Sequence, residues 1–130
     1  METRKYEAGE KKRSGRFNCA QAVLCTYGDK TGVDETTALN IGHAFAVGMG
    51  NMEGTCGALI GAGCVLGLVF KNKAQSIQAM RRIMAKFQER NGATQCKMLK
   101  GIETGKVLRE CPDCVADAAE FLEEEIADIE

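Results

Sequence analysis

The stretch 55–70 constrains the fold more than any other part of this chain, because it is rich in glycine and contains no charged residue. It is short for a helix that must cross the ~30 Å hydrocarbon core of a bilayer, so we interpret it as a buried helix. Gly57 and Gly61 are four residues apart and therefore share one face of that helix. Such a face of small residues lets another helix or a cofactor approach the backbone closely. We therefore predict a central, Gly-rich helix here.

The rest of the chain shows apolar residues at helical spacing, and signals for strands and hairpins are nearly absent. The predicted helices run over residues 3–14, 19–30, 35 to about 47, 56–70, 74–90, 95–100 and from about 112 to the C-terminus. We expect the polar segment 1–14 to be held only loosely. The prediction is an all-α fold, with a single domain over residues 1–130. We expect a compact bundle of about five main helices around the Gly-rich helix, and no sheet.

Charge and composition exclude several classes of function. The formal net charge of −1 gives no general attraction to nucleic acid or to an anionic membrane, so we expect neither as a partner. We interpret the basic residues between Arg4 and Arg16 and the acidic ones after Glu120 as solvated faces. The N-terminus lacks the apolar region of a signal peptide, and no segment is long enough to span a membrane, which predicts a cytoplasmic protein.

Seven cysteines in 130 residues are the strongest functional signal. An odd number cannot pair completely, and in a reducing compartment several thiols more often serve metal ligation or thiol redox chemistry than a disulfide framework. Predicted caps place five of them at four helix starts: Asn18 precedes Cys19, Thr55 precedes Cys56, Thr94 precedes Cys96, and Pro112 lies between Cys111 and Cys114.

A position at a helix start has a chemical consequence. Unpaired backbone N–H groups and the helix dipole favour the thiolate, which is the form that ligates metal and attacks disulfides. Cys25 and Cys64 fall inside predicted helices, where packing is a sufficient explanation. Cys111 and Cys114 form a CxxC pair, but there is no second CxxC for a zinc ribbon and no βαβ pattern for a thioredoxin-like site. A covalent haem site is excluded because Val115, not His, follows Cys114.

The residues around these thiols also resemble a known family. The segments 17–24 (FNCAQAVL) and 54–61 (GTCGALIG), followed by Cys96 and Cys111, are similar to the redox-active C_GCAxxG_C_C family, named for a Cys…CGAxxG…Cys…Cys pattern. The resemblance extends from about residue 15 to the end. It matches four residues to the four family cysteines, namely Cys19, Cys56, Cys96 and Cys111, and leaves Cys25, Cys64 and Cys114 as additional thiols. The segment 45–50 (FAVGMG) departs from the pattern, which has more glycine there, and this predicts a less open approach.

The resemblance implies a redox function and an association with transporters, because members are commonly encoded near them. A similar domain also occurs in a multihaem cytochrome that carries an iron–sulfur centre. Our leading hypothesis is a small electron-transfer or redox-sensing domain whose Cys19, Cys56, Cys96 and Cys111 ligate an iron–sulfur cluster or other metal, with Cys114 as an alternative or fifth ligand. The four sulfur atoms should then converge.

Two alternatives stay open at this point. One is a metal-free thiol–disulfide oxidoreductase or sensor that uses Cys56 with Cys111 or Cys114. The other is a structural zinc site or a cysteine-rich scaffold for a membrane transporter. A redox partner, such a transporter and a second copy of the chain are the partners we consider. His43, the sole histidine, and the loop 48–54 are weaker candidates for a ligand and an anion site, respectively.

Overall fold

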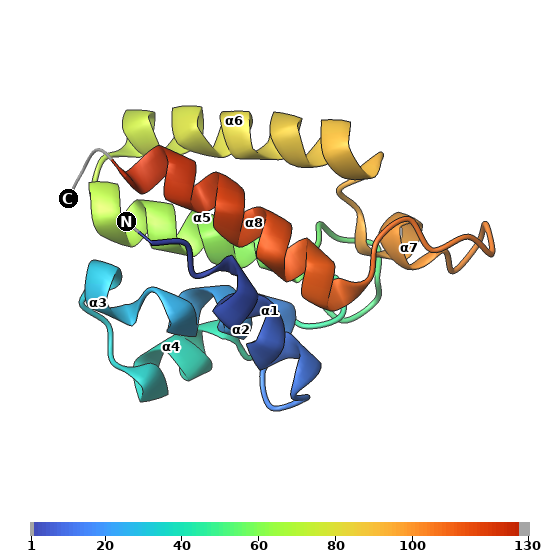
Figure 1. Ribbon diagram of the computed structural model, residues 1–130, viewed down its shortest axis with the longest axis horizontal. Helices are drawn as coiled ribbons and strands as arrows, with labels where there is room; N and C mark the ends of the chain where they lie inside the picture. The colour runs from blue at the N-terminus through green and yellow to red at the C-terminus, as the bar shows by residue number, and fades with distance from the viewer. Residues whose placement is uncertain (1, 128–130) are drawn as a thin grey trace.

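The computed structural model describes residues 2–127 (Figure 1), and within that range it contains no strand, only one isolated antiparallel bridge between Thr55 and Gln95. The all-α prediction is confirmed, with eight helices in these residues where about five main ones were expected. The helices are α1 (Lys5–Arg13), α2 (Cys19–Thr26), α3 (Gly28–Thr31), α4 (Glu35–Gly42), α5 (Gly57–Phe70), α6 (Lys73–Asn91), α7 (Cys96–Lys100) and α8 (Cys111–Ile126).

Helix α5 is the centre of the bundle, as its composition predicts. It packs against α2, α3, α6 and α8. Its small residues allow α2 to approach closely: a Cβ on Gly61 would lie 2.7 Å from the carbonyl oxygen of Ala20, and one on Gly57 would lie 3.3 Å from the Cβ of Cys19. Because real Cβ atoms do not tolerate a 2.7 Å contact with backbone, Gly61 permits a crossing that any other residue would push apart.

Most helix starts follow local capping chemistry. Asn18, Asp34 and Asn72 each accept a hydrogen bond from the backbone N–H three residues later. Two predicted caps are displaced by one residue: Cys56, not Thr55, is the N-cap of α5, and Gln95, not Thr94, is the N-cap of α7.

The remaining differences follow from local turns. The expected helix 19–30 is divided into α2 and α3 at Tyr27, and α4 ends at Gly42, so Phe45 lies in a loop. Helix α8 begins at Cys111, and the predicted continuation of this helix over residues 128–130 lies outside the described part of the chain.

Helix α1 is held more firmly than its polar sequence suggests. It packs along α8, and Ala8 is fully buried there. The basic start of the chain meets the acidic end of α8: Lys5 pairs with Glu120 at 2.8 Å, and Glu123 accepts a hydrogen bond from the backbone N–H of Arg4. The basic residues at the start of the chain and the acidic residues of α8 were each predicted to form a solvated face, but they contact each other. This contact holds α1 against α8.

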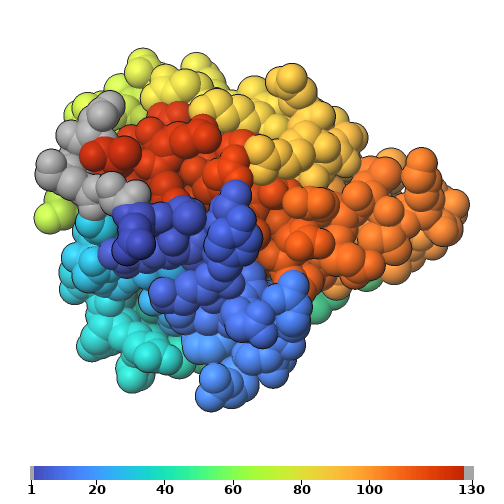
Figure 2. Space-filling view, in the orientation of Figure 1, coloured from blue at the N-terminus to red at the C-terminus, as the bar shows by residue number. Residues whose placement is uncertain are grey.

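The segment after α7 projects from one end of the molecule (Figures 1 and 2). Its Ile102 and Val107 are at least half exposed. Hydrogen bonds from the Leu108 N–H to the Leu99 carbonyl and from the Gly105 N–H to the Gly101 carbonyl close this loop, which leads the chain back to α8. No helix of the described residues is long and apolar enough to cross a membrane.

Candidate functional site

Five cysteines line one cavity of about 70 Å³ where four helix starts meet. The space is large enough for a few water molecules. Its thiols come from the starts of α2, α5, α7 and α8: Cys19, Cys56, Cys96, Cys111 and Cys114. Cys56, Cys96 and Cys114 are buried, whereas Cys19 and Cys111 are partly accessible. The fold therefore gathers in one place five side chains that lie far apart in the sequence.

Local structure explains how three of these residues are positioned. The Asn18 side chain caps α2 reciprocally with Gln21, which fixes Cys19 at the first helical position. The Thr55–Gln95 bridge aligns the other two, since the Cys56 N–H donates to the Thr94 carbonyl at 2.8 Å and the Cys96 N–H to the Gly54 carbonyl at 3.0 Å. This pair of backbone bonds ties the start of α5 to the start of α7.

The first thiol pair joins α2 to α8. The Cys19 thiol donates a hydrogen bond to the sulfur of Cys111, and this bond is the main reason why the pKa of Cys111 falls to about 6. Burial opposes that shift, while the nearby ammonium groups of Lys100 and Lys12 add to it. Donating its proton to Cys111, together with burial, raises the pKa of Cys19. At neutral pH this pair therefore holds one thiolate and one thiol.

The second thiol pair joins α5 to α8 and lies deeper. The Cys114 thiol donates to the sulfur of Cys56, which lowers the pKa of Cys56 against the effect of burial. The backbone N–H groups of Ala58 and Leu59 at the start of α5 also donate to that sulfur. The interaction with Cys56 and burial raise the pKa of Cys114, and the Cys114 thiol donates a hydrogen bond to the carbonyl oxygen of Arg109 at 3.8 Å.

Of the two pairs that the sequence left open, Cys56 with Cys111 or with Cys114, the structure brings the second together, and it adds the pair of Cys19 with Cys111. Cys111 and Cys114 are one turn apart on α8, but Cys111 contacts Cys19 of α2 and Cys114 contacts Cys56 of α5. All seven cysteines are free thiols. Cys96 contributes the fifth sulfur of the cavity, and burial raises its pKa.

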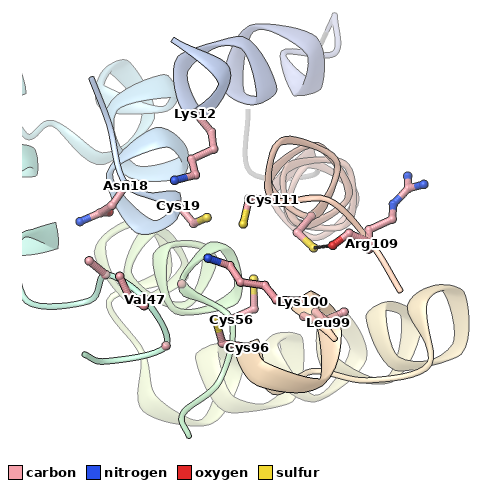
Figure 3. Close-up of a pocket in the computed structure, with 14 residues that line it drawn as sticks. Lys12, Asn18, Cys19, Val47, Cys56, Cys96, Leu99, Lys100, Arg109 and Cys111 are labelled. Atoms are coloured by element: carbon pink, nitrogen blue, oxygen red, sulfur yellow. Dashed lines mark hydrogen bonds between the residues drawn. The ribbon is translucent and has the colours of Figure 1, made fainter. Parts of the chain in front are cut away.

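Two lysines complete the cavity, and neither was identified as a site residue from the sequence. In Figure 3 the amino groups of Lys12 and Lys100 point into the space between the thiols. Lys100 donates to Cys111; burial would lower the pKa of Lys100, but the surrounding cysteines raise it. Lys12 reaches the site from α1, a segment that seemed to be a solvated face. No carboxylate among the described residues lines this cavity, so the cysteines are the acidic groups that face the two ammonium groups there.

Arg109 also borders the cavity, but its guanidinium points away from the thiols (Figure 3). It is anchored to the carboxylate of Asp117, with hydrogen bonds of 3.0 and 3.2 Å. Asp117 is buried and also accepts from Arg90 and Asn91. This network fixes the chain immediately before α8 and thereby orients Cys111 and Cys114.

The loop between α4 and α5 forms a strained edge of the site. Val47 lines the cavity with a φ of +50°, in the left-handed region that β-branched residues avoid. The next residue, Gly48, packs against Cys96: a Cβ at position 48 would lie 2.5 Å from the Cβ of Cys96. The glycine-poor segment 45–50 therefore still contacts a thiol closely, through one glycine and one strained valine.

The other sequence candidates lie elsewhere. Cys25 and Cys64 pack against the core and do not line the cavity. His43 is exposed at the end of α4, where its Nδ1 lies 3.1 Å from the side-chain amide of Gln21, and it too is absent from the cavity wall. This contact gives His43 a structural role next to the α2 cap.

The cavity can be compared with the needs of a metal centre. Thiolates are the donors that zinc and iron–sulfur clusters prefer, so the type of donor fits. The spacing does not fit: within residues 2–127, no three Cys, His, Asp or Glu side chains are grouped so that they could hold one ion. The thiols share a cavity but contact one another in pairs.

Sequence comparison identifies the family to which the chain belongs. A family model described as "Putative redox-active protein (C_GCAxxG_C_C)" matches residues 17–125, which include all five cavity cysteines. The chain belongs to this redox-active family. Searches of curated proteins and of solved structures found no match. Membership in the C_GCAxxG_C_C family agrees with a site built from thiols. The matched residues include every described helix except α1 and the last residue of α8.

Proposed function

We propose that this protein is a thiol–disulfide redox protein whose reactive pair is Cys111 with Cys19. The observation that carries the proposal is the cavity that Cys111 lines together with Cys19, Lys100 and Lys12, all three of which lower the pKa of Cys111. A thiolate at neutral pH beside a protonated thiol is the arrangement that thiol–disulfide exchange requires. Both residues are partly accessible.

The proposed exchange balances without a metal. The Cys111 thiolate attacks one sulfur of a partner's disulfide, forms a mixed disulfide and releases the partner's other sulfur as a thiolate. Cys19 then loses its proton and attacks the Cys111 sulfur, which releases the partner's second thiolate. Two electrons pass to the partner, which becomes a dithiol, and the protein retains a Cys19–Cys111 disulfide. The reverse sequence oxidises a partner dithiol.

The test is disulfide mapping of the full-length protein. Reduced protein is equilibrated in glutathione buffers of graded potential, blocked with N-ethylmaleimide, digested and analysed by mass spectrometry. We expect a Cys19–Cys111 disulfide that appears in a single two-electron transition and is absent from Cys111→Ser, while Cys64→Ser behaves like the wild type. If no disulfide involving Cys111 forms across the whole range, the proposal is wrong.

A thiolate-ligated metal centre is the second candidate, and the five sulfurs around one cavity favour it. An iron–sulfur cluster or zinc would require the thiol pairs to separate and regroup, since their present spacing holds no ion. Cys96 distinguishes the two functions because it belongs to neither pair. Protein purified without oxygen should contain no stoichiometric iron, sulfide or zinc if the dithiol function holds. A brown protein that loses its colour in Cys96→Ser would instead establish the metal centre.

A further inference from the structure

The proposed exchange uses only two of the five cavity thiols, although the other pair is equally well defined. We propose that Cys56 and Cys114 form an internal dithiol that reduces the Cys19–Cys111 disulfide through the shared cavity, so that the chain stores two electron pairs. This inference rests on the proposed function and extends it to the buried half of the site.

The internal pair is inaccessible to a large partner. Cys56 is 5% exposed and Cys114 is 2% exposed, whereas Cys19 and Cys111 are both partly accessible. A folded partner protein can therefore reach the outer pair but not the inner one. Oxidising equivalents must reach the inner pair from within the molecule.

Helix α8 supplies the route. It carries one member of each pair, Cys111 and Cys114, one turn apart and facing the same cavity. Cys56 borders the same cavity, where the charge of Cys111 acts on Cys56 and the charge of Cys56 acts on Cys114. No side chain outside the cavity is needed for a sulfur of one pair to attack a sulfur of the other.

The transfer balances in atoms, electrons and protons. In the first step, the Cys56 thiolate attacks the Cys111 sulfur of the outer disulfide, a Cys56–Cys111 bond forms, and Cys19 leaves as a thiolate. Cys114 then attacks the Cys56 sulfur, a Cys56–Cys114 bond forms, and Cys111 leaves as a thiolate. The proton lost by Cys114 is taken up by Cys19. Two electrons move from the inner to the outer pair.

The contacts of each thiolate suit this direction. The backbone N–H groups of Ala58 and Leu59 hold the attacking Cys56 sulfur in place at the start of α5. Lys100 and Lys12 stabilise the departing Cys111 thiolate, which favours the reduced form of the outer pair. The outer pair is thereby regenerated for a second external disulfide while the inner pair remains oxidised.

Trapping the intermediate tests this inference. Reduced Cys114→Ser lacks the thiol that resolves the internal mixed disulfide, so oxidised glutathione should cause a Cys56–Cys111 disulfide to accumulate. Wild-type protein should lose four thiols, with the Cys19–Cys111 disulfide appearing before Cys56–Cys114. In Cys111→Ser the inner disulfide should form at least about tenfold more slowly, because its route is removed. Cys64→Ser, outside the cavity, is the matched control.

The outcomes separate the two proposals. A wild-type protein that forms Cys19–Cys111 and never Cys56–Cys114 keeps the proposed function and overturns the internal dithiol. Formation of the inner disulfide at the wild-type rate in Cys111→Ser overturns the route through Cys111. Absence of both disulfides overturns the proposed function itself. Should Cys114→Ser fail to fold by circular dichroism, the order of appearance in the wild type and the rate in Cys111→Ser still decide the question.

Discussion

At the residue scale, the property on which the proposed exchange depends is the charge on Cys111. Its pKa of about 6 lies well below the ordinary value of a cysteine thiol, chiefly because the Cys19 thiol donates to it and also because Lys100 and Lys12 are nearby. A lowered pKa favours the thiolate. At pH 7 most Cys111 therefore carries a negative charge, whereas an ordinary cysteine thiol does not. Reactivity should therefore persist in mildly acidic solution.

Alkylation of the reduced protein tests this property. The rate of Cys111 modification by iodoacetamide should rise with pH through about 6 and level off above it, whereas the rate at Cys64 should still be rising above pH 8. Replacing the donor in Cys19→Ala should move the Cys111 midpoint upward, and Lys100→Met should move it in the same direction by a smaller amount. A Cys111 midpoint above pH 8 in the wild type would falsify the assignment of this residue as the thiolate.

Val47 allows a second test at the same scale. Its φ of +50° is unfavourable for a β-branched residue, and its side chain is half exposed, so little packing compensates for the strain. Val47→Gly should stabilise the protein by about 1 kcal/mol, because glycine adopts this conformation without a Cβ clash. Urea unfolding measures the change. Val47→Ala is the control, since it removes the side chain but keeps the Cβ, and it should give no such gain.

At the scale of elements, the close crossing of α2 and α5 decides where the thiols meet. Gly61 lies against Ala20, one residue after Cys19, so the spacing of these helices sets the position of Cys19 relative to the start of α5. Adding a methyl group at this crossing should force the helices apart. The same change at the other end of α5, where there is open space around Gly67, should not.

These two glycines make a matched pair. Gly61→Ala should destabilise the protein by about 1–3 kcal/mol, the typical cost of overpacking, and should reduce formation of the Cys19–Cys111 disulfide. Gly67→Ala should be neutral or stabilising by up to about 1 kcal/mol, because alanine favours a helix more than glycine does. Thermal unfolding and disulfide mapping provide both readouts. Equal stabilities for the two variants would show that the crossing tolerates a Cβ.

At the scale of the whole molecule, α8 is the helix that contacts the other elements around the thiol cavity. It packs against α1, which brings Lys12, and against α2, α5 and α6. Both thiol pairs depend on this one helix, so oxidation of either pair fastens it covalently to another helix. A Cys19–Cys111 bond would close a loop of roughly 90 residues.

Oxidation should therefore stabilise the fold. A loop of this size lowers the entropy of the unfolded chain enough to contribute up to about 4 kcal/mol to the free energy of unfolding. The midpoint of urea unfolding should be higher for oxidised than for reduced wild-type protein. Cys19→Ser removes this outer disulfide and should abolish the part of the difference that it causes. A reduced form as stable as the oxidised form would indicate that the bond strains the native helices.

The sequence by itself determined the helical class, the central place of the Gly-rich helix and the position of most helix starts. Periodicity, small-residue spacing and caps such as Asn18 and Asp34 act over a few residues, so they can be read locally. The family pattern likewise marked Cys19, Cys56, Cys96 and Cys111. The two displaced caps, at Cys56 instead of Thr55 and at Gln95 instead of Thr94, are wrong by one residue, whereas the end of α4 at Gly42 and the break at Tyr27 were not predicted.

Only the tertiary structure decided which thiols are in contact and which cations face them. The sequence left open whether Cys56 would act with Cys111 or with Cys114. The packing of α8 against both α2 and α5 directs Cys111 to Cys19 and Cys114 to Cys56. Lys12 reached the site because charge pairing and a buried alanine hold α1 against α8. Such contacts join residues about 100 positions apart, and no pattern within a few residues encodes them.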